Sequence, residues 1–180
     1  KDDKIPNGYL EICTYSDLQL ITDLTKNYEL LSDINAGGNT FIPIGYGGSE
    51  SNPGSLYSGT FDGNNKKIYN IVIDNPGLNK DRIGLFAQTL TSTVIKNIGI
   101  VGLQLTGRAE SGGLVGYNKG SIINSFTTGT VNGLNNLGGL VGENLGSISF
   151  SYSTATVTGT DERVGGLVGD NQKGTITDSY

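Results

Sequence analysis

Isoleucines recur along the chain at a nearly constant spacing. The positions are Ile68, Ile95, Ile122, Ile148 and Ile176, which stand 27, 27, 26 and 28 residues apart. Around them the chain reads "IYNIVI", "IKNIGI", "IINSFT", "ISFSYS" and "ITDSY", in which alternate positions are apolar or small. This alternation predicts short strands with one buried face, one such strand at the same place in every repeat.

The repeat length predicts a solenoid. Each repeat holds several strand-like runs separated by Gly, Asn and Ser, with no helical periodicity between them. We therefore predict an all-β fold, a single-stranded parallel β-helix in which each repeat forms one coil. The rule for parallel crossovers predicts that it is right-handed. A propeller blade needs roughly 40 residues, so the repeat is too short for that architecture.

A second signal, "GGLVG", occurs at 112–116, 138–142 and 165–169. Its Leu and Val are strand residues, and its glycines allow tight bends. Residues at matching places in successive repeats should stack in columns, and asparagines can then bond their amides along the axis. The predicted columns are Asn118, Asn144 and Asn171; Phe126, Tyr152 and Tyr180; and Asn70, Asn97 and Asn124, continued by Phe150 and Asp178.

The N-terminal part of the chain predicts a short capping helix. "YSDLQLITDL" places Leu18, Ile21 and Leu24 on one helical face, with Ser16 as the N-cap. Such a helix covers the open end of a solenoid core. "YELLSDIN" and "FIPIG" are predicted as the first strands, and Cys13, beside apolar neighbours, as a small buried side chain.

We predict one β-solenoid domain over residues 1–180. Residues 1–57 form the N-terminal cap and first coil, 58–110 the degenerate coils, and 111–180 the regular repeats. Residue 180 falls in the middle of a coil, where it would leave an open strand edge. We therefore expect further repeats or another domain of a longer chain beyond it.

Charge and composition exclude several classes of function. The net charge of −5 argues against nucleic acid or an anionic membrane as a partner. No apolar run approaches the roughly 18 residues of a membrane helix, so no membrane insertion is expected. The sequence contains no histidine, which excludes His-based zinc sites and Ser-His or Cys-His catalytic pairs within it. We expect a non-catalytic protein without a cofactor.

The repeats "GGLVGYNKGSIINSF", "GGLVGENLGSISFSY" and "GGLVGDNQKGTITDSY" resemble the GLUG motif. The upstream segments "YELLSDIN", "PIG" and "GTFDGNNKKIYNI" are similar to those that commonly precede such motifs, so the resemblance covers roughly residues 12–180. It implies a bacterial secreted or cell-surface protein of the adhesin-like class. Similar repeats accompany the zinc metallopeptidases that cleave immunoglobulin A, but the His-Glu-x-x-His signature is absent here. Peptidase activity therefore does not carry over.

Glu143 and Asp170 stand directly after "GGLVG" in successive repeats. In-register stacking would place their backbones about 4.8 Å apart. They could form a weak calcium site or a carboxylate pair for acid/base work on a glycan, or they could be two solvated carboxylates on an outer corner. Tyr117 occupies the preceding position, so no acidic row is maintained. Arg108, Glu110 and residues 161–163 are interpreted as solvated turn residues.

Tyr46 and Tyr57 flank the polar insertion "GYGGSESNPGSLYSG", residues 45–59. They are candidate ligand-binding residues, because tyrosine provides contact area at low entropic cost. Alternatively, they cover the first coil. Asp62 precedes a glycine, a pattern that predicts a turn with the carboxylate bonded to nearby backbone amides.

Together these features predict adhesion or a rigid spacer role in a secreted or cell-surface bacterial protein. A host glycan or an extracellular protein is the expected partner for adhesion. A glycan-processing β-helix enzyme is one alternative. Another is an ice-binding solenoid, suggested by two matched threonine pairs, Thr128 with Thr130 and Thr154 with Thr156, although threonine is also common on exposed strands.

Overall fold

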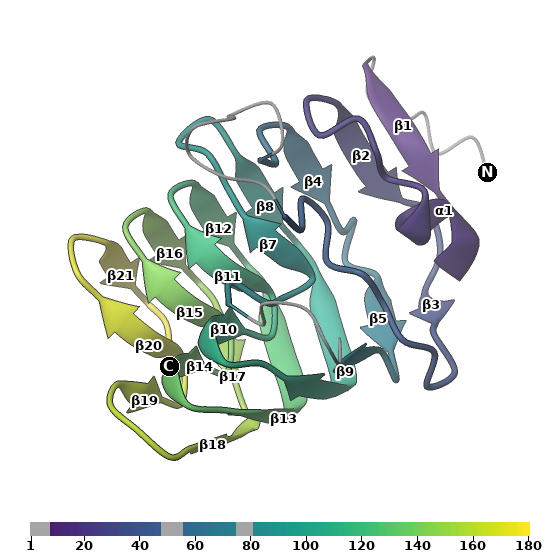
Figure 1. The fold of residues 1–180 in the computed structure, drawn as a ribbon. Helices are drawn as coiled ribbons and strands as arrows, with labels where there is room; N and C mark the ends of the chain where they lie inside the picture. The colour runs from purple at the N-terminus through teal and green to yellow at the C-terminus, as the bar shows by residue number, and fades with distance from the viewer. Residues whose placement is uncertain (1–7, 48–55, 75–80) are drawn as a thin grey trace.

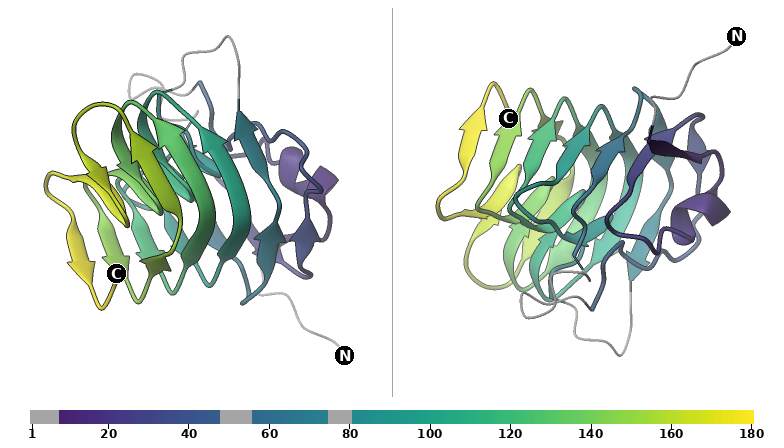
Figure 2. Two further views of the ribbon diagram at one scale, coloured as in Figure 1. Left: turned by 90° about the horizontal axis from the view of Figure 1, so that it is seen from below. Right: turned by 90° about the horizontal axis from the view of Figure 1, so that it is seen from above.

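The computed structural model describes residues 8–47, 56–74 and 81–180. The chain winds through four sheets in a fixed order, and strands of successive coils lie side by side along the axis (Figures 1 and 2). The pairing is parallel in all four sheets. The predicted all-β parallel β-helix is therefore confirmed.

Sheets 1 and 2 form the longer walls of the coil. Sheet 1 contains, in spatial order, β1 (Tyr9–Ile12), β2 (Asn27–Leu30), β4 (Thr60–Asp62), β8 (Val94–Lys96), β12 (Ser121–Ile123), β16 (Ser147–Ser149) and β21 (Thr175–Thr177). Sheet 2 contains β3 (Ile34–Asn35), β5 (Lys67–Tyr69), β9 (Gly99–Thr106), β13 (Phe126–Gly133) and β17 (Tyr152–Ser153), with β6 (Val72–Asp74) on β9 and β18 (Thr156–Gly159) on β13.

Sheets 3 and 4 meet at the "GGLVG" segments. Sheet 3 contains β10 (Ala109–Gly112), β14 (Asn135–Gly138) and β19 (Val164–Gly165). Sheet 4 contains β7 (Phe86–Gln88), β11 (Val115–Asn118), β15 (Val141–Asn144) and β20 (Val168–Asn171).

The isoleucine column of sheet 1 forms one wall of the core. Ile95, Ile122 and Ile148 pair in register and are 0–1% exposed. Burying such a side chain stabilises a fold by about 1.5–3 kcal/mol. The prediction that Ile68 is the first member of this column is wrong. Ile68 pairs with Ile100 in sheet 2, and Phe61 is the residue that pairs with Ile95. The coil from Phe61 to Ile95 is longer than the later coils, so counting back from Ile95 by the usual repeat length leads to sheet 2 instead of sheet 1.

Two of the predicted columns are confirmed. The rings of Phe126 and Tyr152 stack with centroids 5.0 Å apart, and those of Tyr152 and Tyr180 stack at 5.4 Å. Buried Asn118 donates to Asn144 at 2.8 Å, and Asn144 donates to Asn171 at 2.9 Å. These columns tie successive coils together along the axis.

The third column is confirmed only in part. Asn124 donates to Asn97 at 2.9 Å, but Asn70 donates to Asn35 instead, at 3.2 Å. Asn70 follows β5 in sheet 2, whereas Asn97 and Asn124 follow strands of sheet 1. The same misassigned coil that displaced Ile68 explains this difference.

The capping helix exists but differs in detail from the prediction. Helix α1 (Tyr15–Gln19) lies at the N-terminal end of the coil, and its Leu18 is fully buried (Figure 1). Its N-cap is Thr14, not Ser16, because the Thr14 hydroxyl and the Asp17 carboxylate form a reciprocal capping box. The predicted strand at "FIPIG" is reduced to an isolated bridge between Ile44 and Phe86.

Cys13 is exposed, which corrects the prediction of a buried side chain. It directly follows Ile12, the buried last residue of β1, and its backbone N–H donates to the Asp17 carboxylate at 3.0 Å. Successive residues of an extended chain point to opposite sides, so a buried Ile12 directs Cys13 outward.

The "GGLVG" segments bring sheets 3 and 4 into backbone contact. A Cβ atom at Gly142 would lie 2.3 Å from the carbonyl carbon of Glu110, and one at Gly169 would lie 2.5 Å from that of Asn136. Only glycine fits such an approach. The leucine after the paired glycines, Leu114 or Leu140, is fully buried in the core. The bend thus places residues before and after it next to each other.

Candidate functional site

Polar side chains from sheets 3 and 4 come together beside these bends. Each coil supplies one residue before the bend and one after it. We call this feature the polar seam; its pairs are Arg82 with Gln88, Glu110 with Tyr117, Asn136 with Glu143, and Arg163 with Asp170. Direct contacts join three of these pairs, at 2.9, 3.3 and 3.6 Å for the first, third and fourth.

The seam residues that precede the bend share a left-handed backbone. Their φ angles are 58° at Arg82, 48° at Glu110, 50° at Asn136 and 61° at Arg163. Asparagine adopts this conformation readily, whereas arginine and glutamate rarely do. This turn geometry recurs in four successive coils, and the side chains of Arg82, Asn136 and Arg163 contact their partners after the bend.

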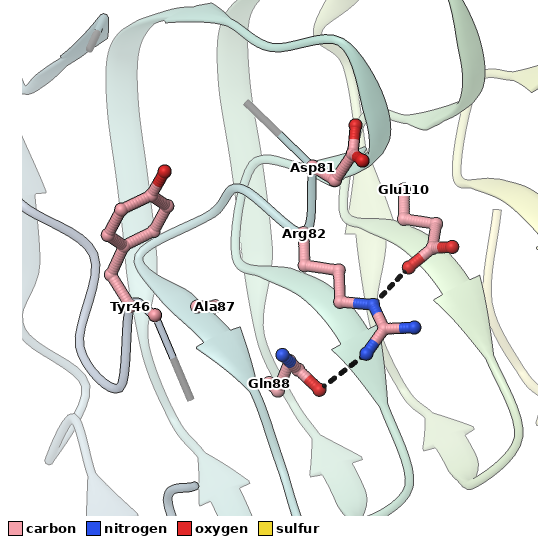
Figure 3. A pocket seen from close by; sticks show the side chains of 7 residues that line it. Tyr46, Asp81, Arg82, Ala87, Gln88 and Glu110 are labelled. Carbon is pink, nitrogen blue, oxygen red and sulfur yellow. Dashed lines mark hydrogen bonds and ion pairs between the residues drawn. The ribbon is translucent and has the colours of Figure 1, made fainter. Parts of the chain in front are cut away.

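Arg82 is the centre of the seam's N-terminal end. Its Nε donates to Glu110 Oε2, and a second guanidinium nitrogen donates to Gln88 Oε1 at 2.9 Å (Figure 3). The guanidinium also lies 4.6 Å from the ring centroid of Tyr117, a cation–π contact. A carboxylate, an amide and an aromatic ring therefore fix this arginine.

A pocket of about 400 Å³ opens at this end of the seam. In Figure 3, Tyr46 stands on one side of it, and Arg82 extends toward Gln88 and Glu110 on the other. Its wall consists of Tyr46, Gly47, Asp81, Arg82, Ala87, Gln88 and Glu110. Asp81 is itself bonded to Arg108 Nε at 2.8 Å. A phenol ring beside fixed ionic and amide groups suits a ligand with several hydroxyl groups.

Glu143 and Asp170 stack in register, as predicted. The interpretation of two solvated carboxylates is wrong for Glu143, which is 6% exposed. Burial raises the pKa of Glu143, and the nearby carboxylates of Glu110 and Asp170 raise it further. Asn136 Nδ2 donates to its Oε2 at 3.3 Å, and Asp170 pairs with Arg163.

Glu143 and Asp170 were also the candidate metal ligands. Within residues 8–47, 56–74 and 81–180, no three or more His, Cys, Asp or Glu side chains are grouped to hold a metal ion. Two carboxylates alone are a poor calcium site, because calcium takes six to eight oxygen ligands.

The importance of Arg82, Glu110 and Arg163 was missed at the sequence level. The interpretation as a solvated turn residue holds for Arg163, which is 55% exposed, but not for Glu110, which is 23% exposed; both side chains also form ion pairs. The spacing held a usable signal, since Arg82, Glu110, Asn136 and Arg163 are separated by 28, 26 and 27 residues. Asp81 and Arg108 are likewise 27 apart, and they pair along the axis.

The two candidate ligand-binding tyrosines have different environments. Tyr46 is half-buried and lines the pocket. Tyr57 is fully buried: its hydroxyl donates to the Lys26 carbonyl at 3.2 Å, its ring lies 4.9 Å from that of Phe86, and burial raises its pKa. The prediction of Tyr57 as a ligand contact is therefore wrong, and it covers the first coil instead.

Asp62 has the predicted turn role. Its Oδ1 accepts from the backbone N–H of Asn64 at 2.9 Å, and its Oδ2 pairs with Lys96 at 3.0 Å. Burial alone would raise the pKa of Asp62, but these bonds, with one from Asn97, hold it below its usual value. One threonine from each of the two predicted pairs stacks in register on sheet 2, Thr130 with Thr156.

The chain is similar to part of a known protein. The chain is 37% identical over 134 residues to Halomucin of Haloquadratum walsbyi. The aligned part is 68% of this chain but 1% of Halomucin, so the chain corresponds to a very small portion of that protein. No protein-family model matches the sequence. No solved structure matches it either.

Proposed function

We propose that this chain is a non-catalytic, rigid module of a secreted or cell-surface protein. The continuity of sheet 1 is the observation that carries the proposal. Its seven strands run in one hydrogen-bonded order from β1 near the N-terminus to β21 near the C-terminus. Each coil buries its apolar ladder against the next, so stiffness passes along the axis.

The likeness to Halomucin supports the placement at the cell surface or outside the cell. A match to a small portion of a much larger protein is what a module of a long chain would give. The resemblance to GLUG repeats supports the same placement. In the part of the chain that the structure describes, no helix is long and apolar enough to cross a membrane.

Backbone relaxation measured by NMR tests the proposed rigidity. We expect order parameters near 0.85 for strand amides from β1 to β21, the value of a rigid backbone. The same values should hold in the last coil, β19 to β21, although its side chains are largely exposed. Values below about 0.6 through one or more complete coils would overturn the proposal.

Adhesion is the second candidate function, and the pocket beside Tyr46 favours it. A rigid scaffold that presents a preformed polar pocket is a common arrangement for recognition. The partner would be a host glycan or an extracellular protein. An array of glycans and matrix proteins, probed with the wild-type chain and with Tyr46→Ala, tests this role. A saturable signal that Tyr46→Ala weakens supports it, and an array without any saturable signal overturns it.

A further inference from the structure

The outer face of sheet 2 carries a regular array of polar side chains. On β13, Thr130 and Asn132 point away from the core, because Val131 between them is fully buried and successive strand residues point to opposite faces. Pairing of β13 with β9 on one side and with β18 on the other extends this pattern over three coils (Figure 1). We call its two columns the polar grid: Gln104, Thr130 and Thr156 form one, and Thr106, Asn132 and Thr158 form the other. All six residues are exposed.

The side chains of the polar grid are not used by the protein itself. None of the six side chains forms a hydrogen bond or an ion pair with another of the described residues. Polar side chains elsewhere on the coils do form such bonds, as Ser147 does when it donates to Ser121 at 3.0 Å on sheet 1. On β13 itself, the Thr128 hydroxyl accepts from the Gly102 N–H at 3.1 Å, so Thr128 is not part of the grid. The hydroxyl and amide groups of the grid therefore face solvent and are available to a ligand.

The polar grid is neutral and rigid. It contains no charged side chain, although charged residues make up 16% of the sequence and the net charge is −5. Charges occur at its margins, where Asp74 pairs with Thr106 and Arg108 follows β9. Four of the six residues are threonines, whose branched Cβ leaves the side chain few rotamers. Neighbouring strands lie about 4.8 Å apart and alternate residues of one strand about 7 Å apart, so the grid is a fixed two-dimensional lattice of hydrogen-bonding groups.

A neutral lattice of this kind suits an ordered solid better than a dissolved ligand. Each hydrogen bond to a dissolved ligand replaces a hydrogen bond to water, so its net contribution is small. A flexible ligand also loses conformational freedom on binding, and the grid has no aromatic ring that would bury apolar area in compensation. The groups of a solid are ordered before they bind. Many weak bonds can then add up, provided that the solid presents its groups at a regular spacing.

We propose that the polar grid binds to the surface of ice. The water molecules of ice are neutral and regularly placed, and each donates and accepts hydrogen bonds, as hydroxyl and amide groups do. Waters held between the grid side chains bridge them to the lattice. Solid polysaccharides are also ordered and neutral, but ligand sites for such molecules are lined mainly by apolar and aromatic side chains, which the grid lacks. Ice binding is an activity beyond the rigid-module role, and it uses the fixed spacing of the coils.

Partitioning of the purified chain into slowly growing ice tests this proposal. Ice is grown from a solution that also contains serum albumin as a non-binding tracer, and both proteins are measured in the ice and in the remaining liquid. We expect the wild-type chain to be enriched in the ice at least about threefold relative to the tracer. Thr130→Lys places a strongly hydrated ammonium group in the middle of the grid and should reduce the enrichment to the level of the tracer. Thr175→Lys makes the same change at an exposed strand residue of sheet 1 and should leave the enrichment unchanged.

Three results would overturn the proposal. One is a wild-type chain that enters the ice no more than the tracer does. Another is enrichment that Thr130→Lys leaves intact or that Thr175→Lys lowers equally, since the grid would then not be the contact. The third is binding to crystalline cellulose or chitin that Thr130→Lys abolishes, which would assign the grid to a polysaccharide surface. Both substitutions are at exposed positions, so thermal melts should show both variants folded. Each outcome is independent of the rigid-module proposal, because backbone relaxation tests that proposal without ice.

Discussion

Glu143 and Asp170 lie opposite each other on neighbouring strands, yet their carboxylates have different partners. Asp170 pairs with the guanidinium of Arg163, at 3.6 Å. Glu143 receives only an amide hydrogen bond from Asn136 and has the carboxylates of Glu110 and Asp170 nearby. Two residues at one repeat position therefore have different electrostatic environments, and that of Glu143 raises the pKa of its carboxyl group.

Glu143→Gln is expected to stabilise the protein at neutral pH. The pKa of Glu143 is raised in the folded state, so its ionisation opposes folding. This penalty is complete above the folded-state pKa, shrinks as the pH falls through it, and is absent below the unfolded value near 4.5. We expect the variant to melt about 2–4 °C higher at pH 7, the shift that ~1 kcal/mol produces.

Thermal melts of wild type and Glu143→Gln between pH 4 and pH 8 measure this difference. The two midpoints should converge at the acidic end of the series. Glu162→Gln is the matched control: it makes the same chemical change at an exposed position, and it should leave the midpoint within about 1 °C of the wild-type value. A lower midpoint for Glu143→Gln at pH 7 would contradict our account of the seam.

Gly142→Ala is expected to be severely destabilising. The added Cβ would lie 2.3 Å from a backbone carbon of Glu110, so sheets 3 and 4 would have to separate. We expect a loss of more than about 3 kcal/mol in the free energy of unfolding. Gly166→Ala changes the same motif where no atom lies within 4 Å, and it should cost less than about 1 kcal/mol. Urea titrations compare the two, and equal losses would disprove the close packing of these sheets.

Asn144→Ala should break the row of side-chain amide bonds formed by Asn118, Asn144 and Asn171, the amide ladder, at its buried centre. Asn144 is fully buried, accepts from Asn118 at 2.8 Å and donates to Asn171 at 2.9 Å, so its removal leaves two neighbours short of a partner. We expect a loss of about 1–3 kcal/mol, the cost of leaving one buried group, the Asn118 amide, without its partner, because Asn171 is exposed to solvent. Asn171→Ala, at the exposed end, should cost clearly less. Chemical denaturation distinguishes the two variants. An Asn144→Ala variant with the same free energy of unfolding as the wild type would show that the ladder does not stabilise the fold.

Cys13 should react in the folded protein. It is exposed and is the single cysteine of the sequence. We expect a maleimide reagent to modify one thiol per chain without denaturant, with little change in the thermal midpoint. Mass spectrometry of the product measures the stoichiometry. Modification that requires denaturant would show that Cys13 is buried after all.

Repetition made much of this fold predictable from sequence. Residues such as Asn118, Asn144 and Tyr152 recur because each coil must match its neighbours, so their spacing reports their contacts directly. The prediction for Ile68 failed because an insertion lengthens that coil, and a spacing argument cannot detect a change of sheet. Cys13 and Ser16 were misassigned near the N-terminus, where no repeat is available as a guide.

The polar seam was hidden for a different reason. Its contacts join residues six or seven positions apart across a bend, as Asn136 and Glu143 do. The sequence shows two glycines at that point but not how closely they let the sheets approach. For Tyr57 the sequence left two alternatives open, because a tyrosine beside a polar insertion can face either solvent or the core, and the structure places it in the core.

The central claim, one continuous rigid stack of coils, is tested most directly by a distance across its length. Spin labels on the native Cys13, after β1, and on Lys173→Cys, between β20 and β21, occupy exposed positions near opposite ends of the stack (Figure 1). Double electron–electron resonance should then give one narrow distance distribution, unchanged by sub-denaturing urea. A broad distribution, or two separate distances, would contradict a rigid parallel β-helix.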